Sequence, residues 1–270
     1  MRTIFTATIL LALIIVEPAL AQWQQVADES VPRTSSGEPE LSAPAPRTAD
    51  GKPDLAGVWA ADADLHMAGV EFVEGEVTLP RHLMNVMIDL EPGKVEMKPW
   101  AAELVQQRLE SRGLIDPVAY CKPWGITQHA ANLSPNKIVQ TPDLIVILYE
   151  QDTVFRQIFL DGRAPVEDPV PRWFGYSTGR WVDDELVVET TGFTDLTWLD
   201  FSGHPHTESL RLTERYRRVD AGHLEIETTV DDPETYSQPF TYTMTATVMP
   251  DDDLLEFFCT DNEISSDHYQ

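Results

Sequence analysis

Hydrophobic and polar residues alternate with a period of two over most of the chain from Lys137 onward. The clearest case is 240–248, where Phe, Tyr, Met, Ala and Val alternate with threonine. Such alternation predicts strands that turn one face to a core and the other to solvent. The stretches predicted as strands are KIVQT, LIVILYEQ, VFRQIFL, GYSTGRW, ELVVETTGF, SLRLTERYRRV, HLEIETTV, FTYTMTATV and LLEFFCT.

Short turns separate these strands, for example at Asp161-Gly162 and Ala221-Gly222. One more strand is predicted at 55–60, where Gly57 and Trp59 form a Gly-x-Trp pattern that is similar to the opening of lipocalin-type barrels. The spacing leaves no room for helical crossovers between the strands. We therefore expect a mainly β fold, an antiparallel up-and-down lipocalin-like barrel of about 8–10 strands.

The region 61–136 lacks this period. Residues 97–112 predict a helix, because apolar residues recur at helical spacing between Pro99 and Gly113. A shorter helix is predicted within 79–90, followed by a proline-punctuated loop over 114–136. This region is expected to be a small helical and loop insertion, at about 61–136, that packs across or beside the mouth of the barrel.

The N-terminus carries the pattern of a signal peptide over 1–21, with Arg2, an apolar run and an Ala-Leu-Ala cleavage site ending at Ala21. The apolar run is shorter than the roughly 20 residues of a membrane span. We expect export to the periplasm or secretion, with no integral membrane span. Residues 22–50 predict a disordered or loosely wrapped leader, and 51–270 a single barrel domain.

The net charge of −26 argues against nucleic acid as a partner, because nucleic acid requires a basic surface. A positively charged or neutral apolar ligand remains compatible with this charge, and the expected partner is a small apolar molecule. The sequence contains no P-loop, no dinucleotide-binding glycine pattern and no Gly-x-Ser-x-Gly nucleophile motif. We therefore expect no cofactor, and the pattern makes no prediction of oligomeric state.

Two cysteines remain after the predicted cleavage, Cys121 and Cys259. In an oxidising compartment such a pair predicts one disulfide. It would join the segment before the barrel to the last strand and contribute roughly 4 kcal/mol in the chain-entropy model. The alternative is two unpaired buried thiols.

Several long segments resemble a group of exported bacterial proteins of unassigned function, described as lipocalin-like or calycin-like. The resemblance covers most of the chain from 46 to about 240, but 61–135 does not match closely. It implies a β-barrel and no particular activity. The segments that carry it are PRTADGKPDLAGVW, KIVQTPDLIVILYE, FRQIFLDGR, GYSTGRWVDDELVVETTGFTDLTWLD, GHPHTESLRLTERY and GHLEIETTVDDPETYSQPFT.

The connector, residues 194–208 between two predicted strands, is the densest run of reactive side chains and is expected to close one end of the barrel. Its candidates are Trp198, Asp200, His204, His206 and Glu208. A metal site of the His-x-His plus Glu kind is disfavoured, since Pro205 interrupts the pair and no matching downstream histidine is evident. Acid–base catalysis by one histidine, oriented by Asp200, Glu208 or Glu214, remains open. The alternative of a loop whose histidine and aspartate side chains only form hydrogen bonds with backbone groups also remains open.

A second set of polar residues falls on predicted inward faces. Alternation places Glu214 on the same strand face as Leu212 and Tyr216, Arg156 on the face of Ile158, and Glu150 on the face of Leu148. Tyr149 is the neighbour of Glu150 in the chain. A buried carboxylate can shuttle protons, and a buried guanidinium can stabilise an oxyanion. The alternative is a buried ion pair that fixes the strand register.

Aromatic residues complete the candidates, with Trp173, Tyr176 and Trp198 suited to line a ligand site. The leading hypothesis is a cofactor-independent lyase, isomerase or hydrolase that acts by proton transfer on a small apolar, aromatic or terpenoid-like molecule in the barrel cavity. His204 or His206 would be the base, Asp200 or Glu214 its orienting carboxylate, and Arg156 with Tyr149 the polarising groups. The alternatives are a non-catalytic carrier of a hydrophobic ligand and an envelope interaction module.

Overall fold

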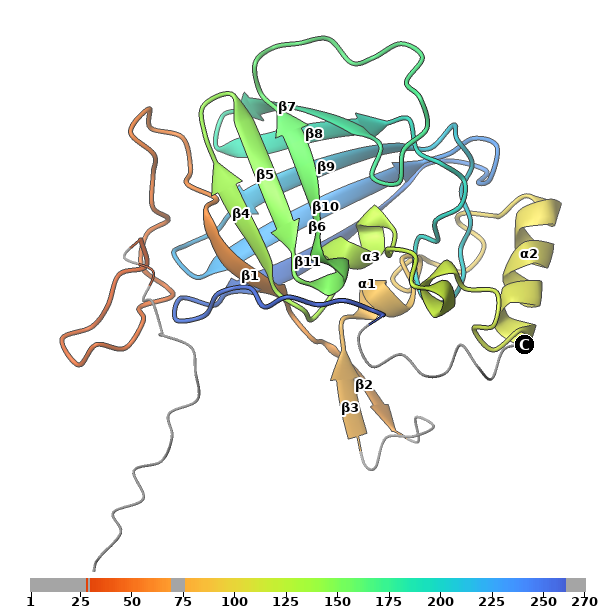
Figure 1. Cartoon of the computed structure of the whole chain (residues 1–270), viewed down its shortest axis with the longest axis horizontal. Coiled ribbons are helices and arrows are strands. Elements are labelled where there is room, and N and C mark those ends of the chain that lie inside the picture. Colours follow the sequence, from red (N-terminus) through yellow and green to blue (C-terminus); the bar gives the residue numbers. More distant parts are fainter. Residues whose placement is uncertain (1–27, 29, 69–75, 261–270) are drawn as a thin grey trace, which may run out of the picture.

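The computed structural model describes residues 28, 30–68 and 76–260, in which nine strands close into a barrel (Figure 1). The barrel strands are β1 (Gly57–Ala61), β4 (Asn136–Gln140), β5 (Leu144–Tyr149), β6 (Val154–Phe159), β7 (Tyr176–Val182), β8 (Glu185–Thr191), β9 (Arg211–Arg218), β10 (His223–Asp231) and β11 (Phe240–Val248). Their order around the barrel is β1-β11-β10-β9-β8-β7-β6-β5-β4. The predicted mainly β, lipocalin-like barrel is confirmed.

One pair departs from the expected antiparallel pattern, because β6 and β7 run parallel. They are joined only at Ile158 with Ser177 and at Phe159 with Thr178. The connection between them, 160–175, contains three prolines, which lack the N–H that a sheet requires. It therefore crosses outside the sheet instead of forming a hairpin, and the barrel wall is least continuous between β6 and β7.

The stretch LLEFFCT, predicted as the last strand, is not a strand. The physical reason is that β1 pairs with both β11 and β4, so the barrel leaves no edge for it at this place. The segment instead lies outside, where the Leu255 N–H donates to the Glu150 carboxylate over 2.7 Å. The predicted disulfide is confirmed between Cys121 and Cys259, whose Cα atoms are 5.5 Å apart.

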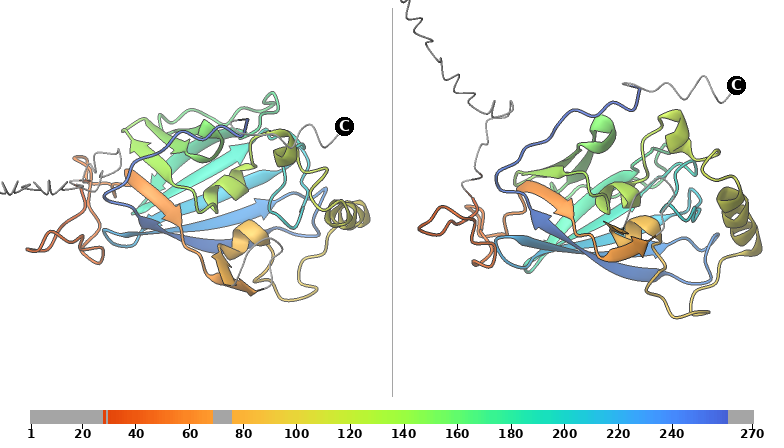
Figure 2. Two further views of the ribbon diagram at one scale, coloured as in Figure 1. Left: turned by 60° about the horizontal axis from the view of Figure 1, so that its bottom comes forward. Right: turned by 90° about the horizontal axis from the view of Figure 1, so that it is seen from below.

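The insertion before β4 contains the helices. The predicted helix over 97–112 is present as α2, whereas 79–90 contributes only the short α1, and the β2–β3 hairpin was not predicted. α1 and α3 lie at one end of the barrel and α2 lies farthest out (Figures 1 and 2). None of the helices in the described ranges is long and apolar enough to cross a membrane. The elements are β2 (Leu65–Ala68), β3 (Glu76–Leu79), α1 (Arg81–Met84), α2 (Pro99–Glu110), η1 (Pro117–Tyr120), α3 (Ile126–Ala130) and, after β5, η2 (Gln151–Thr153).

The described part of the leader, 30–50, forms two similar turns over PRTSSG and PRTADG, whereas the predicted signal peptide, 1–21, lies outside the described residues. In each turn the arginine donates to the carbonyl oxygen of the turn glycine and also reaches a distant carboxylate. The two ion pairs are Arg33 with Asp251 and Arg47 with Asp184, each at 2.6 Å. These contacts hold this part of the leader against the barrel domain.

The barrel interior is filled by its own side chains. Trp59 is completely buried and its indole N–H donates to the Leu55 carbonyl oxygen over 3.0 Å. A cavity among Tyr149, Tyr216 and Ile226 has a volume of only about 10 Å³. This is about the space of one water molecule, so a ligand has no room at this place in the barrel.

Candidate functional site

A buried ion pair crosses the barrel interior between Arg156 on β6 and Glu214 on β9. Arg156 Nη1 lies 2.9 Å from Glu214 Oε1, and Nη2 contacts Oε2. Both residues are only 2% exposed, so their predicted inward placement is confirmed. The remaining N–H groups of Arg156 donate to Ser177, Thr190 and Tyr216. With every donor occupied, Arg156 has no N–H left to stabilise an oxyanion.

Burial and neighbouring charges shift the pKa values of Arg156, Tyr149 and Tyr216 in this network. Burial is the largest single influence on Arg156 and opposes its charge, but Glu214, Tyr216 and Tyr149 together outweigh burial and raise the pKa of the guanidinium. Burial raises the pKa of Tyr149 to about 12 and also raises the pKa of Tyr216. Both phenols therefore stay protonated at neutral pH, and Tyr216 donates to Glu214 over 2.9 Å. The arrangement matches the predicted alternative of a buried pair that fixes register.

Glu150 does not belong to the inward set. Strand β5 turns Ile145, Ile147 and Tyr149 to the interior, while the residues between them are half-buried. Glu150 lies beyond the end of β5 and holds the Leu255 N–H on the outside of the barrel. The prediction failed because LIVILY is apolar on both faces, so alternation alone could not distinguish inside from outside.

The connector contains a histidine and a carboxylate in the arrangement of a general base. Asp200 is completely buried and accepts hydrogen bonds from the backbone N–H groups of Val86 and His204. His204 Nδ1 lies 2.6 Å from Asp200 Oδ2, so Nδ1 donates its proton to the carboxylate, and Nε2 is the ring nitrogen that can exchange a proton with a substrate. Within the described chain nothing bonds to Nε2, and the His204 side chain is 7% exposed. We call this pair the Asp200–His204 dyad.

His206 has a different role, because both of its ring nitrogens are occupied. Nδ1 donates to the Thr207 carbonyl oxygen over 3.1 Å, and Nε2 accepts from the Thr197 hydroxyl over 2.6 Å. Burial lowers the pKa of His206, which favours the neutral ring. Glu208 is exposed and lies apart from the Asp200–His204 dyad. Among the residues that the structure describes, no group of three or more metal-ligating side chains is gathered.

Trp198 joins the connector to helix α2. The Arg108 guanidinium lies 4.5 Å from the centre of the Trp198 ring, and Arg108 Nη1 donates to the Gly203 carbonyl oxygen over 2.9 Å. Burial lowers the pKa of Arg108 to about 10, so the side chain remains charged at neutral pH. Trp198 therefore contributes to the packing that positions the connector rather than to the wall of a barrel cavity.

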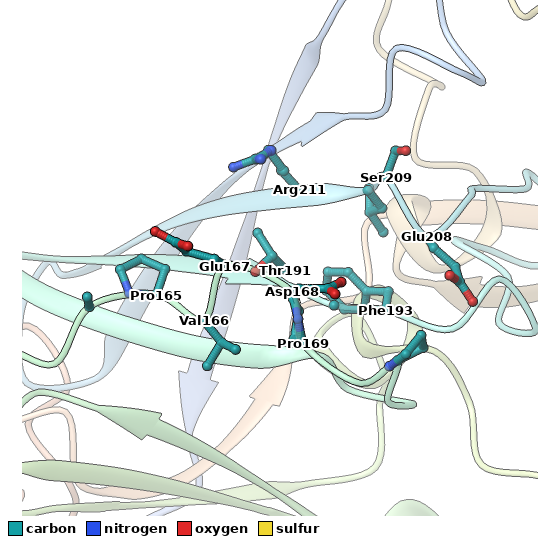
Figure 3. Close-up of a pocket in the computed structure, with 14 residues that line it drawn as sticks. Pro165, Val166, Glu167, Asp168, Pro169, Thr191, Phe193, Glu208, Ser209 and Arg211 are labelled. Atoms are coloured by element: carbon teal, nitrogen blue, oxygen red, sulfur yellow. The ribbon is translucent and has the colours of Figure 1, made fainter.

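Besides a pocket of about 220 Å³ that is lined by Asp62, His82 and Met244, two hollows lie outside the barrel and are lined by predicted residues. A groove of about 630 Å³ runs between the proline-rich segment 164–171 and the ends of β8 and β9, where Glu167, Asp168 and Glu208 make it acidic (Figure 3). A pocket of about 210 Å³ lies where β6 and β7 separate. The predicted aromatic residues Trp173 and Tyr176 both line this second pocket, and Arg156 with Ser177 lies at its base.

Sequence reasoning missed His129 on α3. Burial lowers its pKa to about 3, and neither ring nitrogen has a hydrogen-bond partner among the described residues. Its ring packs 4.7 Å from Tyr149 and 5.4 Å from Phe174, and Nε2 lies 3.5 Å from Asp152. A single histidine in a segment without a regular alternation of apolar and polar residues does not indicate a site. Only the fold brings His129 next to Tyr149, Asp152 and Phe174.

The predicted catalytic residues thus divide into two groups, the barrel network and the connector. Tyr242 lies within electrostatic reach of both, since its pKa is raised by burial and then by Glu214 and Asp200. Comparisons of this chain with known protein families, curated proteins and solved structures gave no match. The function is therefore inferred from the geometry of these two groups and from the composition of the chain.

Proposed function

We propose that this protein is an exported enzyme that performs proton-transfer chemistry, of the lyase, isomerase or hydrolase type, with His204 as the general base. The observation that carries the proposal is the Asp200–His204 dyad with its unoccupied Nε2. Of the two candidate histidines, only His204 combines an orienting carboxylate with a ring nitrogen that no described residue occupies. A positioned base of this kind contributes about 100- to 10,000-fold to a rate.

The surroundings support a preorganised base. Backbone N–H groups fix the Asp200 carboxylate, and this carboxylate fixes the tautomer of His204 and stabilises the imidazolium that forms on proton transfer. The Tyr236 hydroxyl donates to the Pro205 carbonyl oxygen over 2.8 Å, and this hydrogen bond holds Pro205, the residue after His204, in place. The connector can therefore keep Nε2 in one position, so that little reorganisation is needed at each turnover.

The net charge limits the proposed substrate class, and the cavity volume limits where the reaction can take place. The net charge of −26 disfavours large anionic partners, which leaves a small apolar, aromatic or terpenoid-like molecule as the proposed substrate. The cavity in the barrel interior holds only about 10 Å³, so we place the reaction at the connector, outside the barrel. Export is supported by the signal-peptide pattern before Ala21 and by the Cys121–Cys259 disulfide.

The test is to identify a substrate and then to remove the base. Native mass spectrometry of protein isolated from its own cells, followed by small-molecule identification, supplies the candidate compound. Turnover is then compared between the wild type and His204→Gln, with His223→Gln as the matched control. His223 also pairs with a carboxylate, Asp220 at 2.7 Å, but at the start of β10, where its side chain is 42% exposed. We expect His204→Gln to lose at least about 100-fold and His223→Gln to keep full activity.

Full turnover in His204→Gln would refute the acid–base role. The alternative function, a non-catalytic carrier, predicts that the co-purified compound is returned chemically unchanged after prolonged incubation with the protein. It also predicts that the same compound binds equally well to His204→Gln.

A further inference from the structure

The pocket between β6 and β7 has the composition of a ligand site. Its lining is rich in aromatic residues, including Phe159, Trp173 and Tyr176. The volume of about 210 Å³ is below the roughly 300 Å³ at which pockets for drug-sized ligands begin, so it suits a single ring with a small substituent. None of its lining residues belongs to the Asp200–His204 dyad.

The aromatic walls are held in place before any ligand arrives. Phe159 and Tyr176 stack with ring centres 5.4 Å apart, and the Arg163 guanidinium covers Phe159 at 3.8 Å. Arg163 also donates to the Tyr176 hydroxyl over 3.2 Å. The Trp173 indole N–H donates to the Pro123 carbonyl oxygen over 2.8 Å. Walls that are already ordered lose little conformational entropy on binding.

The charges around the pocket favour an anion. Arg156 at its base is neutralised by Glu214, and Arg163 is paired with Asp161 at its edge. Arg172 also lines the pocket, is exposed, and has no ion-pair partner in the described ranges. Its backbone is fixed, since its N–H donates to the Gly192 carbonyl oxygen over 2.9 Å. Arg172 is therefore an available cation beside an aromatic cage, and a guanidinium binds a carboxylate in two places.

We propose that this pocket binds a single-ring aromatic carboxylate, with the ring between the aromatic walls and the carboxylate on Arg172. The ring would gain contact with Trp173 and with Phe159 or Tyr176 in offset or edge-to-face geometry. The parallel pairing of β6 and β7 over only two residue pairs provides the opening in the barrel wall. This inference does not depend on the proposed acid–base activity.

Benzoate is the probe for this proposal, and the Trp173 indole N–H resonance reports binding at the pocket. Benzamide keeps the ring without the charge, and cyclohexanecarboxylate keeps the charge without the aromatic ring. We expect saturable binding that is tightest for benzoate. Arg172→Gln should weaken benzoate binding about 10-fold, as expected for a lost charge-assisted contact, and should change benzamide binding less than about twofold.

Arg180→Gln is the matched control, because Arg180 lies on β7, the strand that carries Tyr176, and is exposed and paired with Glu189. It removes the same charge and should leave benzoate binding unchanged, as should His204→Gln. Equal binding of benzoate and benzamide, or no saturable shift at Trp173, would overturn the proposal. Loss of benzoate binding in His204→Gln would place the ligand at the connector and would overturn it as well.

Discussion

Arg156 and Glu214 form a two-contact ion pair across the barrel, from strands that are not neighbours. The pair therefore joins two strands that are separated by β7 and β8, in the barrel interior, where little water screens the two charges. Every N–H of the guanidinium has an acceptor, and Ser177, Thr190 and Tyr216 complete the shell. We expect this network to fix the arrangement of the barrel.

Removing one member of this pair should therefore be costly. Arg156→Met leaves the Glu214 carboxylate buried without a counter-charge, and we expect a loss of about 3–5 kcal/mol in the free energy of unfolding. The double variant with Glu214→Leu should recover most of that loss. Urea unfolding followed by tryptophan fluorescence measures both. Arg180→Met, which breaks an exposed pair, is the control, and equal effects of the two arginine variants would contradict the interpretation.

The disulfide should be a major contribution to stability. Cys121 and Cys259 are 138 residues apart, and closing a loop of that size restricts the unfolded chain considerably. Replacing both cysteines with serine should lower the free energy of unfolding by about 2–5 kcal/mol. The wild type unfolded in the presence of a thiol reductant should match the double variant. If reductant leaves the wild-type midpoint unchanged, the bond does not contribute in this way.

The free energy of unfolding should decrease as the pH falls, because the unfolded chain binds a proton at His129 more readily than the folded protein does. Its folded-state pKa of about 3 lies below the value of about 6.5 in an unfolded chain, so the unfolded state binds a proton first. The resulting stability is present above pH 6.5 and is lost as pH falls from there toward 3. At pH 5 the loss relative to pH 8 should be about 2 kcal/mol.

His129→Phe removes this proton-binding site, so unfolding measured at pH 8 and pH 5 should differ less than in the wild type. His66→Gln is the control, because His66 lies exposed on β2. The same pH dependence in His129→Phe and in the wild type would show that the loss arises elsewhere.

Gly203 should be needed where the connector meets α2. Its φ of +82° lies in the left-handed region, and an added Cβ would lie 3.0 Å from the Arg108 Cβ. Gly162 has a similar φ of +77° with nothing near it, so Gly162→Ala measures the backbone cost alone. We expect Gly203→Ala to be more destabilising than Gly162→Ala, by about 1 kcal/mol or more. It should also reduce turnover, because His204 follows directly. Equal unfolding free energies would contradict this contact.

The fold was predictable where the alternation of apolar and polar residues was clear. Strands such as 240–248 and the inward positions of Arg156 and Glu214 follow from a period of two. Glu150 and LLEFFCT failed for different reasons. The strand before Glu150 is apolar on both faces, and LLEFFCT found no sheet edge, because whether an edge is free depends on closure of the whole barrel.

The candidate site was predictable in part. The connector was recognised by its reactive residues, but the separation of a free His204 from a fully bonded His206 required the positions of Asp200, Thr197 and the Thr207 carbonyl oxygen. The aromatic pocket was indicated in part by Trp173 and Tyr176. The role of Arg172 depends on which other arginines already have partners.

By itself, the sequence determined the class of fold, the two cysteines that pair and the segment that carries the reactive side chains, because periodicity and composition are local properties. Only the tertiary structure decided which ring nitrogen is unoccupied, where the barrel wall opens and that the interior is filled. These depend on contacts between residues far apart in the chain, such as Arg156 with Glu214 and His129 with Tyr149. Such contacts form when the barrel closes, and no local pattern encodes them.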